Sequence, residues 1–212
     1  GEQNHDLANI VPRWPVPLST KPDGTPDVNS NYGEYVWKEG QFDRCLKELR
    51  SNPDSRRALI LFNRPSVAAS QTGDHICTTS LQFLVVGESL VAIGTMRSNE
   101  LTWSFPLDVG FFTTLQEAMA AELRMSCGPY HHNVGSLHAE QSAVNANHPS
   151  TSWFDLEIDP WPRIEPGQGQ QVIDELQLLD VTLTDPHAKL PIKTAFVKRV
   201  KSLLENSTAD LL

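Results

Sequence analysis

A single mixed α+β domain is the fold class that this sequence predicts, and three observations indicate it. Apolar residues recur at helical intervals in three separate segments, residues 38–49, 115–123 and 191–204. Two apolar runs, residues 81–86 and 90–96, flank Gly87-Glu88 and predict a β-hairpin. Helices and strands then mix without a strict βαβ rhythm, which favours a mixed sheet packed with helices. A chain of 212 residues is long enough to bury one core.

The first half of the chain predicts its elements in order. The first thirty residues contain five prolines and predict an ordered surface loop. The helix over residues 38–49 should end at Ser51-Asn52-Pro53, and residues 57–62 should form a strand. Gly128-Pro129 should terminate the helix over residues 115–123.

The second half is less regular. Residues 147–169 are rich in Pro, Trp and Gly and predict a long irregular connection. Residues 172–183 predict one or two strands, and Pro191 should lie near the first turn of a final amphipathic helix. One domain would then cover the whole chain, with a motif-bearing part at residues 14–148 and a divergent C-terminal part at residues 149–212.

Composition argues against several partners. The formal charge of −9 and the pI near 5.2 disfavour a nucleic-acid polymer, because phosphate backbones are bound by clustered lysines and arginines. The three cysteines have no paired metal-type spacing and no signal-peptide run precedes them, which favours a reducing cytoplasm and no metal site. No apolar stretch approaches the ~20 residues that span a bilayer, so we expect no membrane partner.

Five strings of residues carry the strongest functional signal. They are Asn29-Ser30-Asn31-Tyr32-Gly33, Asn52-Pro53-Asp54-Ser55-Arg56-Arg57, Cys77-Thr78-Thr79-Ser80-Leu81-Gln82-Phe83, Met96-Arg97-Ser98-Asn99-Glu100 and Val134-Gly135-Ser136-Leu137-His138. In this order the chain resembles the thymidylate synthase superfamily, and within it the cytidylate and deoxycytidylate hydroxymethylases. The resemblance covers roughly residues 14–138. It implies a thymidylate synthase-like mixed sheet, a homodimer, and 5,10-methylenetetrahydrofolate as co-substrate.

Cys77 matches the nucleophile of that family. C5 of a pyrimidine is a poor nucleophile, and addition of a thiolate at C6 makes C5 enamine-like, so this chemistry requires a cysteine. A neighbouring guanidinium such as that of Arg97 would favour the thiolate form. Taken alone, Cys77 would be a small buried residue at the head of a strand. Cys45, on an apolar helix face, and Cys127, at a helix end, are expected to be core or bystander residues.

The family's nucleotide-phosphate site is matched by Arg56, Arg57, Arg97 and Ser98. Planar guanidinium groups meet phosphate oxygens bidentately at such sites. In the superfamily the double arginine serves the active site of the other subunit, which implies a homodimer with shared sites. Gln82 lies in family register and is expected to bind the substrate. An Asp-Ser-Arg-Arg string alone would more often be a solvated turn.

Asp108 stands where thymidylate synthases carry an asparagine that reads uracil. Cytosine offers an N4 amino donor, and N3 is protonated once C6 has been attacked, so an acceptor-only carboxylate suits both. Uracil O4 would oppose another acceptor, a mismatch of roughly 1–3 kcal/mol, so we expect a cytosine preference of at least about tenfold. An isolated aspartate here would instead be a helix N-cap.

His138 matches the residue that contacts the sugar 3′-hydroxyl, and Glu140 stands where the family carries a tyrosine. A carboxylate there can accept a hydrogen bond from a ribose 2′-hydroxyl, which favours CMP over dCMP and resembles the cytidylate hydroxymethylases of nucleoside-antibiotic pathways. The alternative is that Glu140 points to solvent. Trp14 is expected to contact the folate, whereas Trp103 is more typical of core packing.

The predicted reaction is hydroxymethyl transfer to C5 of CMP or dCMP, with water trapping the methylene intermediate. The family's glutamate base and a phosphate-binding arginine loop lie well upstream of Trp14, where this chain has too few residues to hold them. Three explanations stay open: a missing N-terminal part, a compromised enzyme, or another acid such as Glu140.

Three rival functions are a thymidylate synthase acting on dUMP, a cytidine deaminase and a catalytically silent nucleotide-binding protein. His138-Ala139-Glu140 imitates the deaminase zinc motif. That motif also needs a following Pro-Cys-x-x-Cys pair, and no cysteine follows Cys127.

Overall fold

The structure is a computed structural model that describes residues 30–68, 74–102, 104–139, 162–184 and 191–209. The chain divides into two compact units, residues 1–98 with 125–136, and residues 99–124 with 137–212. Helices and strands occur in both units, so the predicted mixed α+β class is confirmed. The expectation of one domain stays a prediction. Among the described helices, none has the length and apolar character that a bilayer crossing requires.

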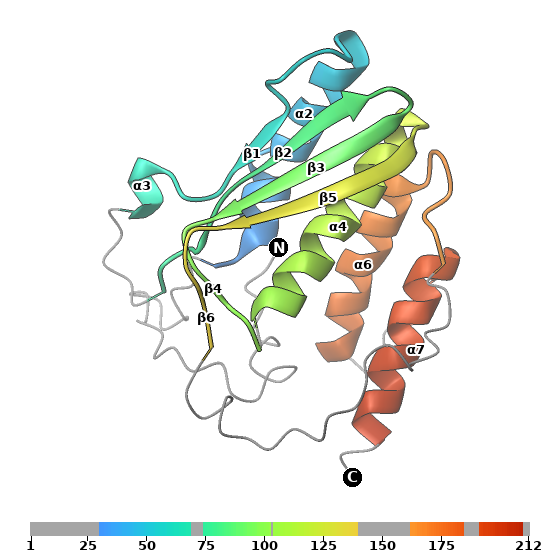
Figure 1. Ribbon diagram of the computed structural model, residues 1–212. Coiled ribbons are helices and arrows are strands. Elements are labelled where there is room, and N and C mark those ends of the chain that lie inside the picture. The colour runs from blue at the N-terminus through green and yellow to red at the C-terminus, as the bar shows by residue number, and fades with distance from the viewer. Residues whose placement is uncertain (1–29, 69–73, 103, 140–161, 185–190, 210–212) are drawn as a thin grey trace, which may run out of the picture. The chain divides into compact units, whose positions relative to one another are not determined.

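The first unit is built on a mixed four-stranded sheet in the order β1-β2-β3-β5 (Figure 1). The strands are β1 (Leu59–Leu61), β2 (Thr78–Val86), β3 (Ser89–Met96) and β5 (Ser126–Val134). β1 and β3 pair antiparallel with β2, whereas β5 pairs parallel with β3. The helical elements of this unit are the π-helix η1 (Glu34–Lys38), α2 (Gln41–Ser51) and α3 (Pro65–Ala68).

The predicted hairpin is confirmed. β2 and β3 pair up to Val86 and Ser89, and Gly87 in the two-residue loop has a φ of 61°, in the left-handed region that glycine tolerates. β2 starts at Thr78, three residues earlier than the predicted run, because its first residues pair with the end of β3. Cys77 therefore lies directly before the first residue of the central ladder.

The first predicted helix is confirmed with a later start. α2 buries Phe42, Cys45, Leu46 and Leu49, the residues whose spacing predicts it. It begins at Gln41 because Gly40 has a φ of 63°, which ends the preceding π-helix. The strand predicted over residues 57–62 is shorter and comprises β1 alone.

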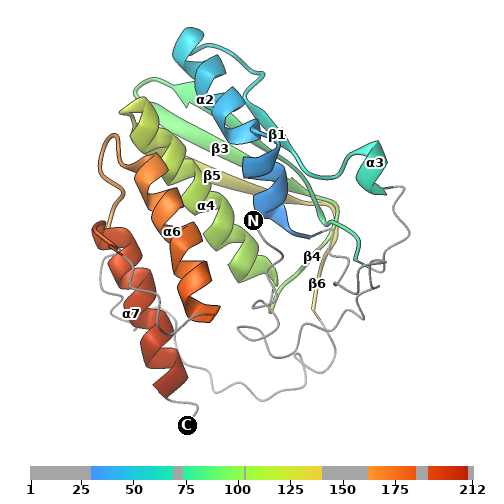
Figure 2. The same cartoon turned by 180° about the vertical axis from the view of Figure 1, so that it is seen from behind.

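In the described part of the second unit there are a small parallel ladder and three helices. The ladder pairs β4 (Asn99–Glu100) with β6 (Leu137–His138). The helices α4 (Ser104–Leu123), α6 (Gly169–Thr184) and α7 (Ala195–Ala209) lie side by side in that order (Figures 1 and 2). α4 buries a mainly apolar set of residues that includes Phe112, Leu115 and Met119.

The end of α4 corrects one prediction. The helix stops at Leu123, followed by Arg124 in the left-handed region with a φ of 57°, and Gly128-Pro129 lies inside β5. A Cβ at Gly128 would lie 2.9 Å from the Leu90 carbonyl oxygen, so this glycine permits close strand packing. Cys127, predicted at a helix end, is exposed in β5.

The strands predicted over residues 172–183 are wrong, because this segment is the helix α6. Val172, Ile173 and Leu179 are buried, which is one face of a helix. α6 lies against α4, and Gly169 leaves no room for a Cβ beside Ala118. Tertiary packing thus overrides the strand preference of its β-branched residues.

A buried carboxylate sets the start of α7. Glu175 on α6 accepts hydrogen bonds from the backbone N–H groups of Lys193 and Thr194 and from the Thr194 hydroxyl at 2.6 Å. Burial acts to raise the pKa of Glu175, but these bonds and one from Gln171 outweigh it and lower the pKa. The predicted start at Pro191 is therefore four residues too early. Residues 162–168 are irregular as predicted, and the other loop segments predicted at residues 1–29 and 147–161 lie outside the described residues.

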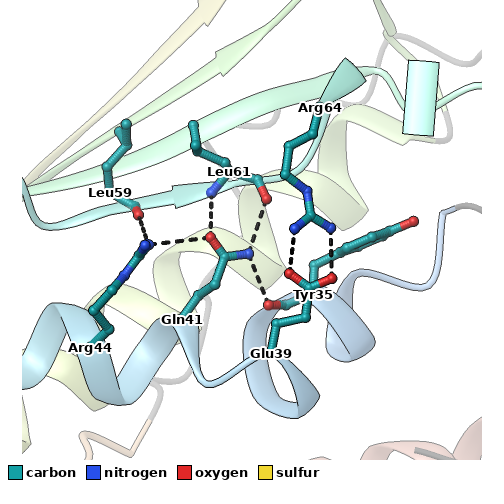
Figure 3. A network of polar contacts seen from close by, with 7 residues as sticks. All are labelled: Tyr35, Glu39, Gln41, Arg44, Leu59, Leu61 and Arg64. Atoms are coloured by element: carbon teal, nitrogen blue, oxygen red, sulfur yellow. Dashed lines mark hydrogen bonds and ion pairs between the residues drawn. The ribbon is translucent and has the colours of Figure 1, made fainter. Parts of the chain in front are cut away.

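Side chains of α2 cover the outer edge of β1 (Figure 3). Gln41 donates through Nε2 to the Leu61 carbonyl at 3.0 Å and accepts from the Leu61 N–H at 2.9 Å. Arg44 donates to the Leu59 carbonyl at 2.7 Å. The free backbone groups of an edge strand can pair with another strand. The Gln41 amide bonds the Leu61 N–H and carbonyl, the groups that a neighbouring strand would otherwise bond. Next to it, Arg64 donates from both terminal guanidinium nitrogens to the Glu39 carboxylate and lies over the Tyr35 ring.

We predict that Gln41→Leu destabilises the protein by about 1–3 kcal/mol, because the Leu61 N–H and carbonyl lose their partners while the side-chain volume is kept. Urea unfolding measures the change. Ser51→Ala is the control, since this exposed hydroxyl bonds only a carbonyl at the end of α2 and should change stability by less than about 0.5 kcal/mol. Equal effects of the two substitutions would contradict the edge role of Gln41.

Candidate active site

Cys77 is the half-buried thiol among three free cysteines. Its Sγ lies 3.8 Å from the His75 carbonyl oxygen, to which it donates. Cys45 is fully buried in α2, and burial raises its pKa to about 11, so its thiolate is inaccessible at neutral pH. Burial argues against Cys45, and its position directly before β2 within a motif string distinguishes Cys77 from the exposed Cys127 as the candidate nucleophile of the sheet unit.

Arg97 forms hydrogen bonds with the backbone of the segment that carries Cys77. Its backbone N–H donates to the Cys77 carbonyl at 2.9 Å, and its guanidinium donates to the carbonyls of Ile76 and His75 at 3.1 and 3.0 Å. A guanidinium carries five N–H groups, and two are used here, so it keeps donors for an oxyanion. The structure places Arg97 against the backbone that carries Cys77, and Ser98 follows in the chain. The expected effect of the guanidinium on the Cys77 thiolate stays a prediction.

A cavity of about 280 Å³ opens at this place, lined by Asn63, Ala68, His75, Ile76 and Arg97. It lies where the chain leaves β1 and returns toward Cys77. The Arg97 guanidinium and the Asn63 amide supply hydrogen-bond donors to its wall, which suits an anionic or carbonyl-bearing ligand.

Residues 30–33 of the first motif string are anchored on both sides of Cys77. The Asp74 carboxylate accepts from the Ser30 N–H and hydroxyl, both at 2.7 Å, and the Tyr32 hydroxyl accepts from Thr78 Oγ1 at 2.8 Å. Tyr32 is thus held next to the residue that follows Cys77, a placement that sequence reasoning missed. Its presence in one of the five motif strings was the available signal.

Arg56 and Arg57 lie far from Cys77 of the same chain. The register Leu59↔Gln82 places Arg57 level with the seventh residue after Cys77, roughly 20 Å away at about 3.3 Å per strand residue. Both arginines are exposed, and Arg57 pairs with Glu48 at 2.8 Å. Gln82 donates to the Arg56 carbonyl at 3.0 Å, so it lies with these arginines and not at Cys77. Their substrate-binding roles stay predictions.

In the helical unit, Asp108 lies one turn into α4 and is not the helix N-cap. Asn99 of β4 donates through Nδ2 to Asp108 Oδ2 at 2.6 Å. Burial raises the pKa of Asp108 from 3.8 to about 6, and the hydrogen bond from Asn99 lowers it only in part. Sequence reasoning missed Asn99, whose only signal was its place after Arg97-Ser98.

His138 is exposed on β6, and its carbonyl accepts from the Leu101 N–H at 2.8 Å. The β4–β6 register pairs it with Glu100. Glu140, Trp14 and Trp103 lie outside the described residues, so their predicted roles stay predictions. Within the described part of the chain, no three His, Cys, Asp or Glu side chains gather so that they could hold a metal ion.

A sequence model of thymidylate synthase matches residues 25–197, which is most of the chain. The chain belongs to the thymidylate synthase family. The family predicted from the five strings is therefore confirmed.

This family member is 33% identical over 148 residues to the deoxycytidylate 5-hydroxymethyltransferase of Enterobacteria phage T4, a match of 63% of this chain and 58% of the phage protein. It is 30% identical over 101 residues to the deoxyuridylate hydroxymethyltransferase of Bacillus phage SP01, which covers 46% of this chain and 26% of that protein. A putative thymidylate synthase of Methanocaldococcus jannaschii is 27% identical over 119 residues, 53% of this chain and 54% of the relative. The matches thus span less than two thirds of these relatives.

The raised pKa of Asp108 predicts a stability change with a defined sign. The folded pKa of about 6 exceeds the usual 3.8, so the folded state binds the proton more tightly and the contribution of Asp108 to stability falls as pH rises from about 4 to about 6. Two pKa units correspond to at most about 3 kcal/mol. Asp108→Asn should therefore be more stable than the natural protein at pH 8, by about 1–3 kcal/mol.

Urea unfolding of both proteins between pH 4 and pH 8 measures this difference. The gain should shrink toward pH 4, where the natural carboxyl is protonated and resembles the amide. A stability difference that stays constant over this range would contradict the burial of an ionisable group at this position.

Proposed function

We propose that this chain acts as a pyrimidine nucleotide C5-hydroxymethyltransferase. It converts CMP or dCMP, 5,10-methylenetetrahydrofolate and water to the 5-hydroxymethyl nucleotide and tetrahydrofolate. The observation that carries the proposal is Asp108, a partly buried carboxylate held by Asn99 at the position that matches the base-reading residue. The similarity to a deoxycytidylate 5-hydroxymethyltransferase supports the same reaction class.

The thiolate of Cys77 adds to C6 of the pyrimidine, and C5 then attacks the one-carbon unit of the folate. Loss of the C5 proton and departure of tetrahydrofolate leave an exocyclic methylene. Water adds to this methylene, and the Cys77–C6 bond breaks to release the product. The Arg97 guanidinium donates to the carbonyls of His75 and Ile76, the two residues before Cys77. This supports the role of Cys77, because a nucleophile must be held at a fixed attack position.

Asp108 selects the base by hydrogen-bond polarity. Its oxygens accept from the N4 amino group of cytosine and from N3 after protonation, whereas uracil places an acceptor, O4, at the position of N4. A buried mismatch of this kind costs roughly 1–3 kcal/mol. The chain should therefore prefer cytosine nucleotides to dUMP by at least about tenfold.

The phosphate is bound by Arg97 and Ser98 of one subunit and by Arg56 and Arg57 of its partner. The roughly 20 Å between Arg57 and Cys77 along β2 supports a role in trans, because this arginine cannot reach a ligand bonded to its own Cys77. A homodimer with two shared sites follows. His138 contacts the sugar, Trp14 contacts the folate, and Glu140 favours the ribose of CMP.

Product mass after incubation with methylenetetrahydrofolate and each of CMP, dCMP and dUMP tests the reaction. We expect the cytosine nucleotides to gain the mass of CH2O, because a hydroxymethyl group replaces the C5 hydrogen, with CMP favoured over dCMP. Methylation of dUMP would select the thymidylate synthase alternative, and cytosine nucleotide binding without any product would select a silent binding protein.

Cys77→Ser should lower turnover by at least about 1000-fold, because the covalent route is lost. Cys127→Ser is the matched control, since this exposed thiol in β5 should be dispensable. Full activity of Cys77→Ser would exclude the covalent adduct.

Mixing Arg56→Ala and Cys77→Ser subunits tests the shared site. Each homodimer should be inactive, whereas a hybrid dimer holds one site with both defects and one intact site. Random exchange should restore about one quarter of the natural activity. No recovery in dimers shown to exchange would place the arginine in the site of its own subunit.

A further inference from the structure

Asn99 carries a buried side-chain amide, and the backbone around it is held by hydrogen bonds. Its side chain is 1% exposed, and its strand β4 pairs with β6. The backbone that follows is held by the bond from the Glu100 N–H to Ser104 Oγ at 3.0 Å and by the bond from Leu101 to His138. The amide therefore presents its Nδ2 from a fixed position.

Asn99 Nδ2 donates a hydrogen bond to Asp108 Oδ2 at 2.6 Å. The terminal torsion of an aspartate is broad and roughly two-fold, so an isolated carboxylate on α4 would rotate. A donor from rigid backbone selects one rotation. A carboxylate has about four acceptor positions, so one bond leaves capacity for a ligand.

We propose that Asn99 is a positioning residue that fixes the plane of the Asp108 carboxylate for cytosine recognition. This inference rests on the proposed function and adds a specificity determinant outside the nucleotide contacts. Cytosine presents its two donors side by side in one plane, so both must meet acceptors in that plane. Rotation of the carboxylate breaks one of the two hydrogen bonds.

The polarity of the bond supports the same role. An N–H donor favours the ionised carboxylate, which only accepts, and it acts against the burial that raises the pKa of Asp108. A protonated carboxyl would offer one donor and one acceptor, the pattern that suits uracil. Asn99 therefore supports both the orientation and the charge that cytosine requires.

The test compares Asn99→Leu, which keeps the approximate volume and removes the donor, with the natural protein. We expect kcat with the cytosine nucleotide to fall at least tenfold with a smaller change in KM, because the N3 contact forms only after C6 is attacked. The ratio of kcat/KM for cytosine to that for uracil should fall by a similar factor. A merely structural role would lower the activity with both bases equally.

Two matched variants complete the design. Gln116→Leu removes another buried amide, which lies on α4, and it should cost stability without changing the base ratio. In an Asp108→Asn background, Asn99→Leu should have little further effect on the base ratio, because the carboxylate on which it acts is gone.

A double-mutant cycle on the free energy of unfolding separates failure of this inference from failure of the proposed function. Urea unfolding of Asn99→Leu, Asp108→Asn and the double variant needs no nucleotide, and non-additive stability changes are expected for a direct pair. Additive changes, or an unchanged base ratio in Asn99→Leu, would overturn the positioning role. A natural protein that forms no hydroxymethyl product would overturn the proposed function, and the unfolding cycle would still decide whether Asn99 holds Asp108.

Discussion

The hydrogen-bonded end of the β2–β3 hairpin is the constraint that holds Cys77, the proposed nucleophile, in place. Arg97 lies just past β3 and donates to three consecutive carbonyls that lead into β2, those of residues 75, 76 and 77. These hydrogen bonds from a single residue fix the backbone that carries Cys77 against the end of the β2–β3 ladder. The same guanidinium keeps further N–H donors beside the segment that carries the thiol.

At Asp108, the charge proposed for base recognition lowers the stability of the folded protein. Burial raises its pKa, so ionisation at neutral pH weakens the folded state, and a neutral amide would be the more stable choice. Sites that must read a ligand by charge commonly retain such a cost. The bond from Asn99 offsets part of it, because it stabilises the ionised form in one orientation.

Much of the fold could be predicted where the determining interactions are local. The hairpin and α2 follow from alternation, helical spacing and a two-residue turn, and the structure has both. The segment of α6 could not be predicted, because its β-branched residues favour a strand until α4 supplies a surface. The start of α7 also depends on a distant residue, Glu175, whose carboxylate binds the Thr194 N–H.

The sequence by itself determined the family and the candidate site residues, since Cys77, Arg97 and Asp108 are recognised by residue type and by their order along the chain. Only the tertiary structure decided how these groups are held. Asn99 meets Asp108 nine residues away, and Arg97 meets carbonyls some twenty residues earlier. Such bonds depend on which backbone segments the folded chain brings within about 3 Å, and no local pattern of residues encodes that proximity.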